Sequence, residues 1–561
     1  MGGPPDPATL ERPWLASYPP GVPPTYRLPE VTLTRFLEDA ARDFPERTAI
    51  AVGRHRVDHV TLRVRADAVA TALSRRGVTT GDRVLIGLPN SVALPIVLLA
   101  VWRLGAVAVP VDPRAQPERI VAIVRDAQVA VAIATGTVLH HLGEHAATPP
   151  LTVQVTGDEW PVGGRLARLA PRARSRPRPL RRRRTGDAEE TIPLAALLPE
   201  GEVRELPAPA TPDHVAMLAY RPRSHQLRGV VLTHRNLVAS AFQSRLWVPD
   251  EQAGREVLVV PDGVFETPAL ALGWLAGLLS AATVVLLDEP DPGALARAVE
   301  REGATLLVAV PRRLNGLATD GDASRRDLTS LRVVLAQGAP LDPAVAATLE
   351  GRTAGARVRE LFGLAEAGGL THGQPVYGRT TTGTAGLPVT STVAAVVDLH
   401  DLGALLPPGE PGRLLVHGPQ VALGYLGHEE ASADRFVHGW LVTDDLAVVD
   451  DEGIFTHLGR RDAVVDRDGW LVSLRAVEAT LEDHPAVRRA GVVGTEDGGV
   501  LVAAVVVRRR SRPSPDDLLA HGREHLDPRS LPDRVVLVDA LPEDAIGELD
   551  RDALRRDLVG R

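Results

Sequence analysis

Two arginines in the segment AYRPRSHQLRGVVLTHRN, residues 219–236, could bind phosphate. Arg223 and Arg228 carry planar guanidinium groups that can pair with phosphate oxygens through parallel hydrogen bonds. A phosphate-binding loop usually gains its other donors from glycine backbone and from hydroxyl groups. Here the arginines are accompanied by no glycine before residue 229, by Ser224 alone as a hydroxyl, and by a proline that lacks a backbone N–H. The segment is therefore either an altered anion-binding loop or a loop that no longer closes over phosphate.

The sequence lacks two residue types that many enzymes use for catalysis. All 63 basic residues are arginine, and there is no lysine or cysteine. Reactions that need a lysine ammonium or a cysteine thiolate are therefore excluded, as are disulfides. Codon drift in a GC-rich genome would produce an all-arginine set, and so would selection against a reactive or modifiable amine.

A run of eight arginines from Arg172 to Arg184 lies in the segment 165–190. Its charge and interspersed prolines are typical of a solvated, disordered insertion, although it could also dock an acidic partner. Nucleic acid is a poor fit because no aromatic residue is interleaved for base stacking. The net charge of −8 over the whole chain gives no further reason to expect nucleic-acid binding.

The order of apolar segments predicts the elements that must position these groups. A chain of 561 residues exceeds the size of a single core, so at least two domains are expected. Short apolar runs alternate with helix-length segments, which predicts a large α/β domain with mostly parallel sheets over residues 1–458. A smaller α+β domain is predicted at 459–561, with the joint near 459–463. The apolar runs lie at 83–89, 106–113, 129–136, 283–290, 305–311 and 331–340.

The most apolar stretch, Ser91 to Val111, is interrupted by Pro95, Arg103 and Gly105. This pattern predicts a buried helix, a turn and a strand rather than a membrane span. The first residues, MGGPPDPATLERPW, do not combine a cationic start with an apolar core. We therefore expect a cytoplasmic protein.

Several sequence blocks match those of a known protein superfamily in the same order, from about residue 30 to the end of the chain, apart from the arginine-rich segment. It resembles the adenylate-forming superfamily of acyl- and aryl-CoA synthetases, fatty acyl-AMP ligases, nonribosomal adenylation domains and luciferases. The resemblance implies the same α/β architecture with a small C-terminal domain. The matching blocks are GVTTGDRVLIGLPNS, LGAVAVPVDP, VVLTHRNLVAS, DLTSLRVVLAQGAPLDP, LFGLAEAGGLTHGQP, GTAGLP, PPGEPGRLLVHGPQVALGYL, GWLVTDDLAVVDDEGIFTHLGRRD and IGELDRDAL.

The resemblance also implies a reaction and a set of site residues. Family members activate a carboxylate with ATP and Mg²⁺ to an acyl-adenylate and pass the acyl group to a thiol, so an acyl or aryl carboxylate or thioester, and CoA or an acyl carrier protein, are the implied partners. By family position Glu366 holds Mg²⁺, although it could instead be a solvated loop carboxylate. Asp445 accepts hydrogen bonds from the ribose hydroxyls, although it could instead be a plain turn residue. The implied adenosine contacts are Gly338, Ala339, Pro340, Phe362, Gly363, Asp445 and Arg460, and Val264, Gly338 and Gly368 border the acyl group.

Several positions depart from the family pattern where phosphate must be bound. The threonine before the glutamate is Ala365, and a glycine beside the ribose-binding aspartate is Asp444, which adds a carboxylate near a polyanion. The lysine near the C-terminus is replaced by Glu548, so a catalytic cation has become an anion. At an effective dielectric constant near 20, such a charge repels phosphate by several kcal/mol.

Three functions are compatible with this pattern. The leading interpretation is a degenerate member with little or no ATP-dependent ligase activity, which retains acyl, carboxylate or adenylate binding or acts as a partner in a biosynthetic pathway. A working acyl-CoA or acyl-carrier ligase that uses Arg223 and Arg228 for phosphate is the first alternative. Acyl transfer or cyclisation without ATP is the second, and the fold alone cannot separate them.

Overall fold

A computed structural model describes residues 2–156, 191–194, 210–220, 227–467, 470–495, 499–508, 511–542 and 549–559. Three features that the sequence singles out lie outside these residues. They are the loop around Arg223 and Ser224, the arginine-rich segment 165–190, and Glu548.

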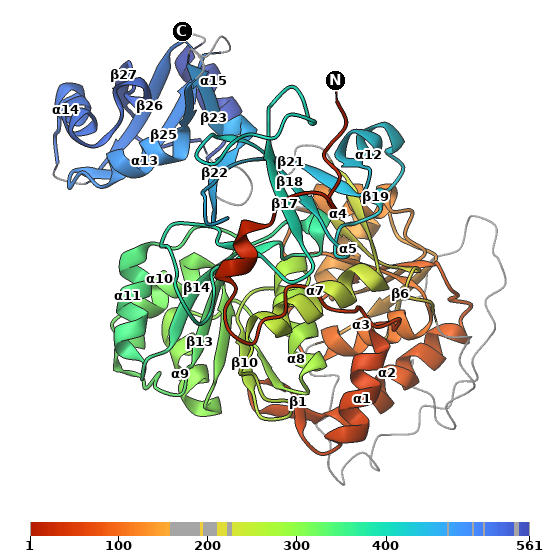
Figure 1. The fold of residues 1–561 in the computed structure, drawn as a ribbon. Helices are drawn as coiled ribbons and strands as arrows, with labels where there is room; N and C mark the ends of the chain where they lie inside the picture. Colours follow the sequence, from red (N-terminus) through yellow and green to blue (C-terminus); the bar gives the residue numbers. More distant parts are fainter. Residues whose placement is uncertain are drawn as a thin grey trace.

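Two large, mostly parallel sheets form the body of the chain (Figure 1). In the first, the order is β16 (Leu387–Pro388), β15 (His372–Gly373), β14 (Arg357–Phe362), β13 (Val333–Gln337), β12 (Leu306–Ala309), β10 (Val257–Val260), β11 (Thr283–Leu286), β1 (Thr48–Val52) and β2 (His55–Asp58). In the second, it is β19 (Gly424–Tyr425), β9 (Gly229–Thr233), β8 (Val215–Tyr220), β4 (Val107–Pro110), β3 (Arg83–Gly87), β5 (Val131–Ala134), β6 (Leu151–Gln154) and β7 (Thr191–Pro193). The predicted α/β class with mostly parallel sheets is confirmed.

The strands are buried, which explains why their sequences are continuous apolar runs. Every residue of β4, β5, β11 and β12 is buried, as expected for parallel strands that helices cover on both faces. The core between the sheets contains side chains of α1 (Thr34–Asp43), α2 (His59–Ser74), α3 (Ala93–Arg103), α7 (His234–Trp247) and α8 (Ala276–Leu279). Separate cores join the first sheet to α9 (Pro292–Glu302), α10 (Pro311–Thr319) and α11 (Pro343–Arg352), and the second to α4 (Pro117–Asp126) and α5 (Gly136–Glu144).

One sequence prediction can be followed directly in these elements. The apolar stretch at 91–111 forms α3, a turn at Gly105 with φ +69°, and β4, so its expected helix, turn and strand are confirmed. The segment GVVLTHRN forms β9 and the start of α7, where Thr233 and Asn236 cap the helix reciprocally. Within the part of the chain that the structure describes, no helix is both long and apolar enough to cross a bilayer.

A third, antiparallel sheet carries part of the candidate site. Its strands are β17 (Val393–Val397), β18 (Gly412–His417), β21 (Trp440–Val449), β20 (Phe436–Val437) and β22 (Phe455–Arg460). The helix α12 (Glu429–Arg435) leads into β20. Pairing of β21 with β22 places Asp445 opposite Arg460, so two of the predicted site residues share one position in the ladder.

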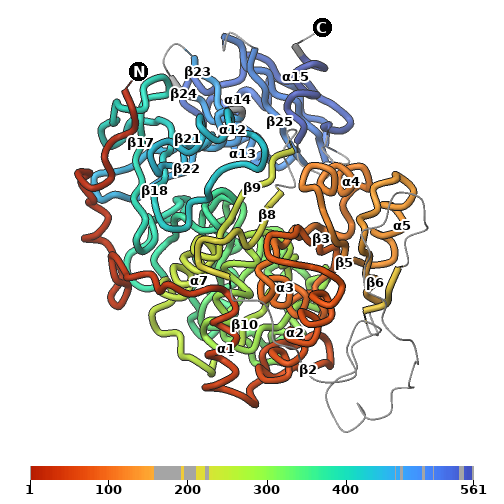
Figure 2. Tube along the Cα trace, turned by 90° about the vertical axis from the view of Figure 1, so that its right-hand side faces the viewer, coloured from red at the N-terminus to blue at the C-terminus, as the bar shows by residue number. Residues whose placement is uncertain are grey.

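The N-terminal segment, residues 2–31, runs along the side of this sheet (Figure 2). Hydrogen bonds anchor it: the backbone N–H of Gly2 donates to Asp401 at 2.8 Å, and the indole of Trp440 donates to the carbonyl of Pro5 at 2.9 Å. Trp14, in the short helix η1 (Pro13–Ser17), packs edge-on against Phe455 of β22, with ring centroids 6.1 Å apart. The segment thus connects the first residues of the chain to the strand that carries Arg460.

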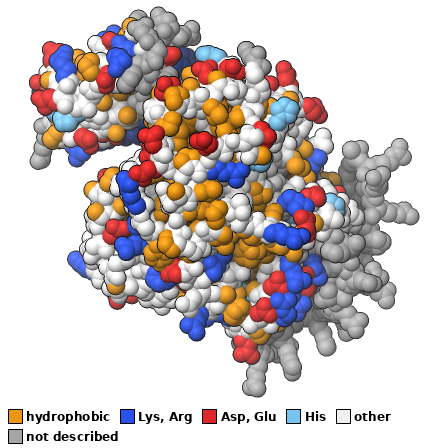
Figure 3. Space-filling model, viewed as in Figure 1, with side chains coloured by type: hydrophobic (Ala, Val, Ile, Leu, Met, Phe, Trp, Pro, Cys, Tyr) orange, Lys and Arg blue, Asp and Glu red, His pale blue; other side chains and the backbone are white. Residues whose placement is uncertain are grey.

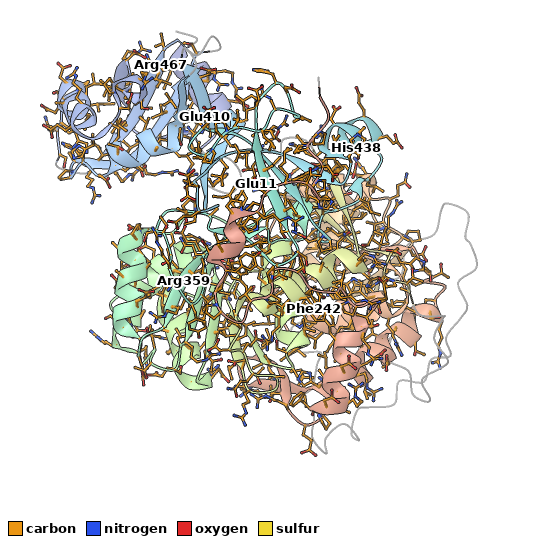
Figure 4. The ribbon with its side chains drawn as sticks, in the orientation of Figure 1. Glu11, Phe242, Arg359, Glu410, His438 and Arg467 are labelled. Carbon is orange, nitrogen blue, oxygen red and sulfur yellow. The ribbon has the colours of Figure 1, made fainter. Side chains whose placement is uncertain are left out.

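A smaller unit follows β22 and has its own apolar cores. It contains the hairpin β23 (Val464–Arg467) and β24 (Trp470–Ser473), the sheet β25 (Val487–Gly494), β26 (Leu501–Val507) and β27 (Arg534–Leu537), and the helices α13 (Leu474–Glu482), α14 (Pro515–His525) and α15 (Arg551–Val559). Arg551 ties α15 to α13 through Glu478, at 2.6 Å and 2.9 Å. Figure 4 labels Arg467 in this unit and Phe242 in the large body. A hollow separates the unit from the lobe with α10 and α11 (Figure 3).

A buried carboxylic acid in the large body lies outside the candidate site. Glu251 follows α7, is 8% exposed, and has the Arg245 guanidinium at 3.7 Å. Burial raises the pKa of Glu251 to about 7, despite the opposing effects of Arg245 and Ser280. Folding therefore becomes less favourable as pH rises from about 4.5 to 7, because only the unfolded chain releases this proton freely in that range.

We predict that Glu251→Gln removes this pH dependence. Relative to the native chain, the variant should be more stable at pH 8 than at pH 5: its free energy of unfolding minus that of the native chain should be larger at pH 8 by on the order of 2–3 kcal/mol. Urea denaturation at both pH values measures the difference. The exposed Glu46→Gln is the matched control, for which no such change is expected. An equal shift in both variants would contradict the assignment.

Candidate active site

Phe362 ends β14 and begins the loop that carries Glu366. Its ring lies 4.7 Å from the ring of His457 on β22 and 5.9 Å from that of His372 on β15. The next residue must be glycine, because a Cβ on Gly363 would lie 2.0 Å from the carbonyl oxygen of Gly369. The loop therefore folds back on itself directly after the aromatic side chain.

Glu366 lies in the short turn η5 (Ala365–Ala367) and is 1% exposed, so the alternative of a solvated loop carboxylate is wrong. The hydroxyl of Tyr425 donates to its Oε1 at 2.8 Å, and its backbone carbonyl accepts from the N–H of Ala422. Gly368 closes the turn with φ +61°, where a Cβ would lie 2.4 Å from the hydroxyl of Ser240. The carboxylate is thus held by the hydroxyl of Tyr425 on β19.

Arg228 lies close to this carboxylate through Tyr425. Its guanidinium carbon is 5.4 Å from the centroid of the Tyr425 ring, a cation–π contact, and the phenol hydroxyl of the same ring binds Glu366. Of the two arginines that the sequence proposes for phosphate, this one is therefore one side chain away from the predicted magnesium ligand.

Asp445 is 6% exposed and lies inside β21, so the alternative of a plain turn residue is wrong. Its Oδ1 is 2.8 Å from Nε2 of His457, the ring that also faces Phe362. His457 was not among the residues predicted from the sequence. Its position three residues before Arg460, on the strand paired with β21, is the signal that could have identified it.

Asp444, the carboxylate where the family has glycine, is surrounded by arginines. Arg435 at the end of α12 donates a short hydrogen bond to its Oδ2, and Arg460 lies 3.8 Å from the same oxygen. Arg413 of β18 lies 3.7 Å from the other oxygen, Oδ1. Burial opposes ionisation, but the hydrogen bond from Arg435 and the nearby guanidiniums outweigh it and lower the pKa of Asp444. The sequence predicted the added charge of Asp444 but not its three partners.

These side chains come together around a narrow cavity of about 10 Å³, close to the space that one water molecule needs. Of the predicted site residues, Glu366, Asp445 and Arg460 are in its wall. The complete lining is Leu364, Glu366, Arg435, Leu441, Thr443, Asp444, Asp445 and Arg460.

The other predicted residues lie apart from this cavity. Gly338, Ala339 and Pro340 are exposed after the end of β13, and Gly338 has φ +89°. Val264 is fully buried, and its backbone N–H donates to the side chain of Asn90 at 2.9 Å. Their proposed roles beside the adenine and the acyl group stay predictions.

We predict that the pairing of Asp444 with Arg435 stabilises the third sheet. The Arg435 side chain is 13% exposed and also donates to the carbonyl of Val442 at 2.7 Å, so Arg435→Ala removes two hydrogen bonds. Its cost should be about 2 kcal/mol in the free energy of unfolding. Arg460→Ala, at 47% exposure and 3.8 Å from the carboxylate, should cost less than about 1 kcal/mol. Chemical denaturation compares the two, and equal losses would contradict the ranking.

Comparison with known proteins accounts for nearly the whole chain. The AMP-binding enzyme family matches residues 37–426, and the AMP-binding enzyme C-terminal domain matches residues 476–548. The chain is similar to a long-chain-fatty-acid–CoA ligase of Bacillus subtilis (strain 168), at 28% identity over 98% of each chain. It is also similar to a feruloyl-CoA synthase of Amycolatopsis sp., at 30% identity over 92% of this chain and 97% of the relative.

Solved structures share the fold. The crystal structure of an anthranilate CoA ligase in complex with anthranoyl-AMP superimposes with a TM-score of 0.78 at 22% identity, over 95% of this chain and 98% of the ligase. At this level of identity the likeness concerns the architecture alone, in both the large body and the smaller unit.

Proposed function

Because the chain belongs to the AMP-binding enzyme family, within the adenylate-forming superfamily, we propose an acyl-CoA-synthetase-like protein with little or no ATP-dependent ligase activity. In this proposal the scaffold retains binding of an adenylate, an acyl group or a carboxylate. Relatives with known activity are CoA ligases, so the proposal depends on what differs in this chain at the site itself.

The charge around the central cavity is the observation that carries the proposal. Its lining contains two arginines, Arg435 and Arg460, against three carboxylates, those of Glu366, Asp444 and Asp445. The wall therefore has a formal charge of 2 − 3 = −1. Like charges a few ångströms apart repel by several kcal/mol at an effective dielectric constant of about 20. Glu366 and Asp445 match the family pattern, so Asp444 is the carboxylate that adds repulsion toward a triphosphate in this chain.

Two substitutions outside this charge balance support the same conclusion. Ala365 presents a methyl group where the family resemblance implies a threonine hydroxyl for the α-phosphate, and loss of one such donor lowers rates on the order of 10²-fold in other enzymes. Glu548 replaces the lysine that the resemblance places on the reacting groups. The phosphate half of the site is altered at each of these positions.

The adenosine half supports retained binding. Phe362 can stack on a purine. Asp445, oriented by His457, can accept hydrogen bonds from the hydroxyl groups of a ribose. Among the described residues, no group of three or more metal-ligating side chains comes together. Glu366 alone would depend on phosphate oxygens to complete the coordination of the ion.

A second candidate function, active ATP-dependent ligation, is favoured by Arg228. Its contact with Tyr425 places a guanidinium near Glu366, where a cation could replace a lost lysine. In that case pyrophosphate would be released, whereas ATP-independent acyl transfer or cyclisation would proceed without it.

We predict no pyrophosphate release above background when the full chain is incubated with ATP, Mg²⁺ and a panel of carboxylic acids. The panel includes a long-chain fatty acid, ferulate and anthranilate, and the long-chain-fatty-acid–CoA ligase of Bacillus subtilis serves as the positive control. Turnover with any acid that Glu366→Ala abolishes would overturn the proposal in favour of an active ligase.

We also predict that AMP binds more tightly than ATP in calorimetric titrations, because the adenosine contacts remain and the triphosphate contacts do not. Asp445→Ala should weaken AMP binding by about ten- to a hundredfold, since a charge-assisted hydrogen bond to the ribose contributes roughly 1.5–3 kcal/mol. Asp451→Ala, an exposed aspartate in the turn after β21, is the matched control. Tighter binding of ATP than of AMP would contradict the charge argument.

A further inference from the structure

The three arginines around Asp444 come from three separate elements and converge on one carboxylate. Arg413 lies on β18, Arg435 ends α12 and Arg460 ends β22. Such convergence is more than a single ion pair needs, because one guanidinium already provides both hydrogen bonds that a carboxylate accepts in a bidentate pair.

The cations are crowded and partly removed from water. Side chains of Arg413 and Arg435 are 19% and 13% exposed, and that of Asp444 is 32% exposed. Burial lowers the pKa of Arg413, and the charges of Arg435 and Arg461 lower it further. Asp444 is therefore the acceptor that these three guanidiniums share.

The chemistry of the cluster matches a phosphate better than a carboxylate. A phosphate monoester has about two negative charges at neutral pH and three terminal oxygens, so each guanidinium can have an acceptor of its own. Asp444 and the arginines Arg435 and Arg460 line the central cavity beside Glu366 and Asp445. An anion at the edge of that cavity would compete with the aspartate for these guanidiniums.

We propose that Arg413, Arg435 and Arg460 form a binding site for phosphate or a phosphate monoester, and that Asp444 is a built-in competitor that occupies it. This inference deepens the proposed function and rests on it in one respect, that the cavity is where an adenylate would bind. It assigns Asp444 an inhibitory role in anion binding. An aspartate with a purely structural role on the strand would not affect anion binding.

Isothermal titration of the full chain with inorganic phosphate tests the inference. Asp444→Ala should bind phosphate at least tenfold more tightly than the native chain. The double variant Asp444→Ala with Arg435→Gln should lose that gain. Asp451→Asn, which removes one negative charge from the exposed turn after the same strand, should leave the affinity unchanged and thereby controls for net charge.

A second measurement covers the case in which Asp444→Ala is too unstable to titrate. Asp444→Asn keeps the shape of the side chain, and millimolar phosphate should raise its melting temperature more than that of the native chain or of Asp451→Asn. Equal phosphate effects on all three proteins, or a gain that survives Arg435→Gln, would overturn the inference.

Repeating the titrations with AMP and with adenosine distinguishes binding of free phosphate from binding of a nucleotide phosphate. A gain for both phosphate and AMP, but not for adenosine, assigns the cluster to the phosphate group. A gain for adenosine as well would contradict the inference, because the change would then concern the whole cavity. Pyrophosphate release by the native chain would overturn the proposed function alone and would leave this phosphate titration unaffected.

Discussion

The pairing of β21 with its neighbouring strands is the constraint on which the candidate site depends. Asp444 and Asp445 are adjacent in β21 and both line the central cavity, but their carboxylates have different partners. Asp444 is bound by arginines, whereas Asp445 is paired with His457, whose ring lies against Phe362. A shift of one residue in the pairing of β21 with β22 would exchange these roles and dismantle both groups.

Positive charge in this chain comes entirely from arginine, and this shapes how the site is neutralised. A guanidinium remains charged under all ordinary conditions and forms hydrogen bonds in a fixed plane, so a half-buried arginine needs an acceptor at a defined position. Asp444 provides that acceptor for Arg435 and stands near two further guanidiniums. Ordering of the strands and pairing of these arginines therefore depend on the same carboxylate.

Much of the architecture could be predicted from the sequence, because fully buried parallel strands and amphipathic helices leave strong local patterns. The helix, turn and strand at 91–111 are one case. The partners of Asp444 could not be predicted, since Arg413 is 31 residues away and meets β21 only through the register of an antiparallel pair. His457 was missed for a similar reason, because its importance arises from a cross-strand neighbour rather than from its own motif.

The contact between Trp14 and Phe455 has a practical consequence. Phe455 begins β22 and touches the buried ring of His372, whose centroid is 4.8 Å away, while the far end of the same strand leads into the smaller unit. Trp14 is 3% exposed, so its indole emission depends on how closely that strand is packed. Any rotation of the smaller unit that twists β22 would change the surroundings of this ring. The chain thus contains an intrinsic fluorophore that can report movement of the strand without a label.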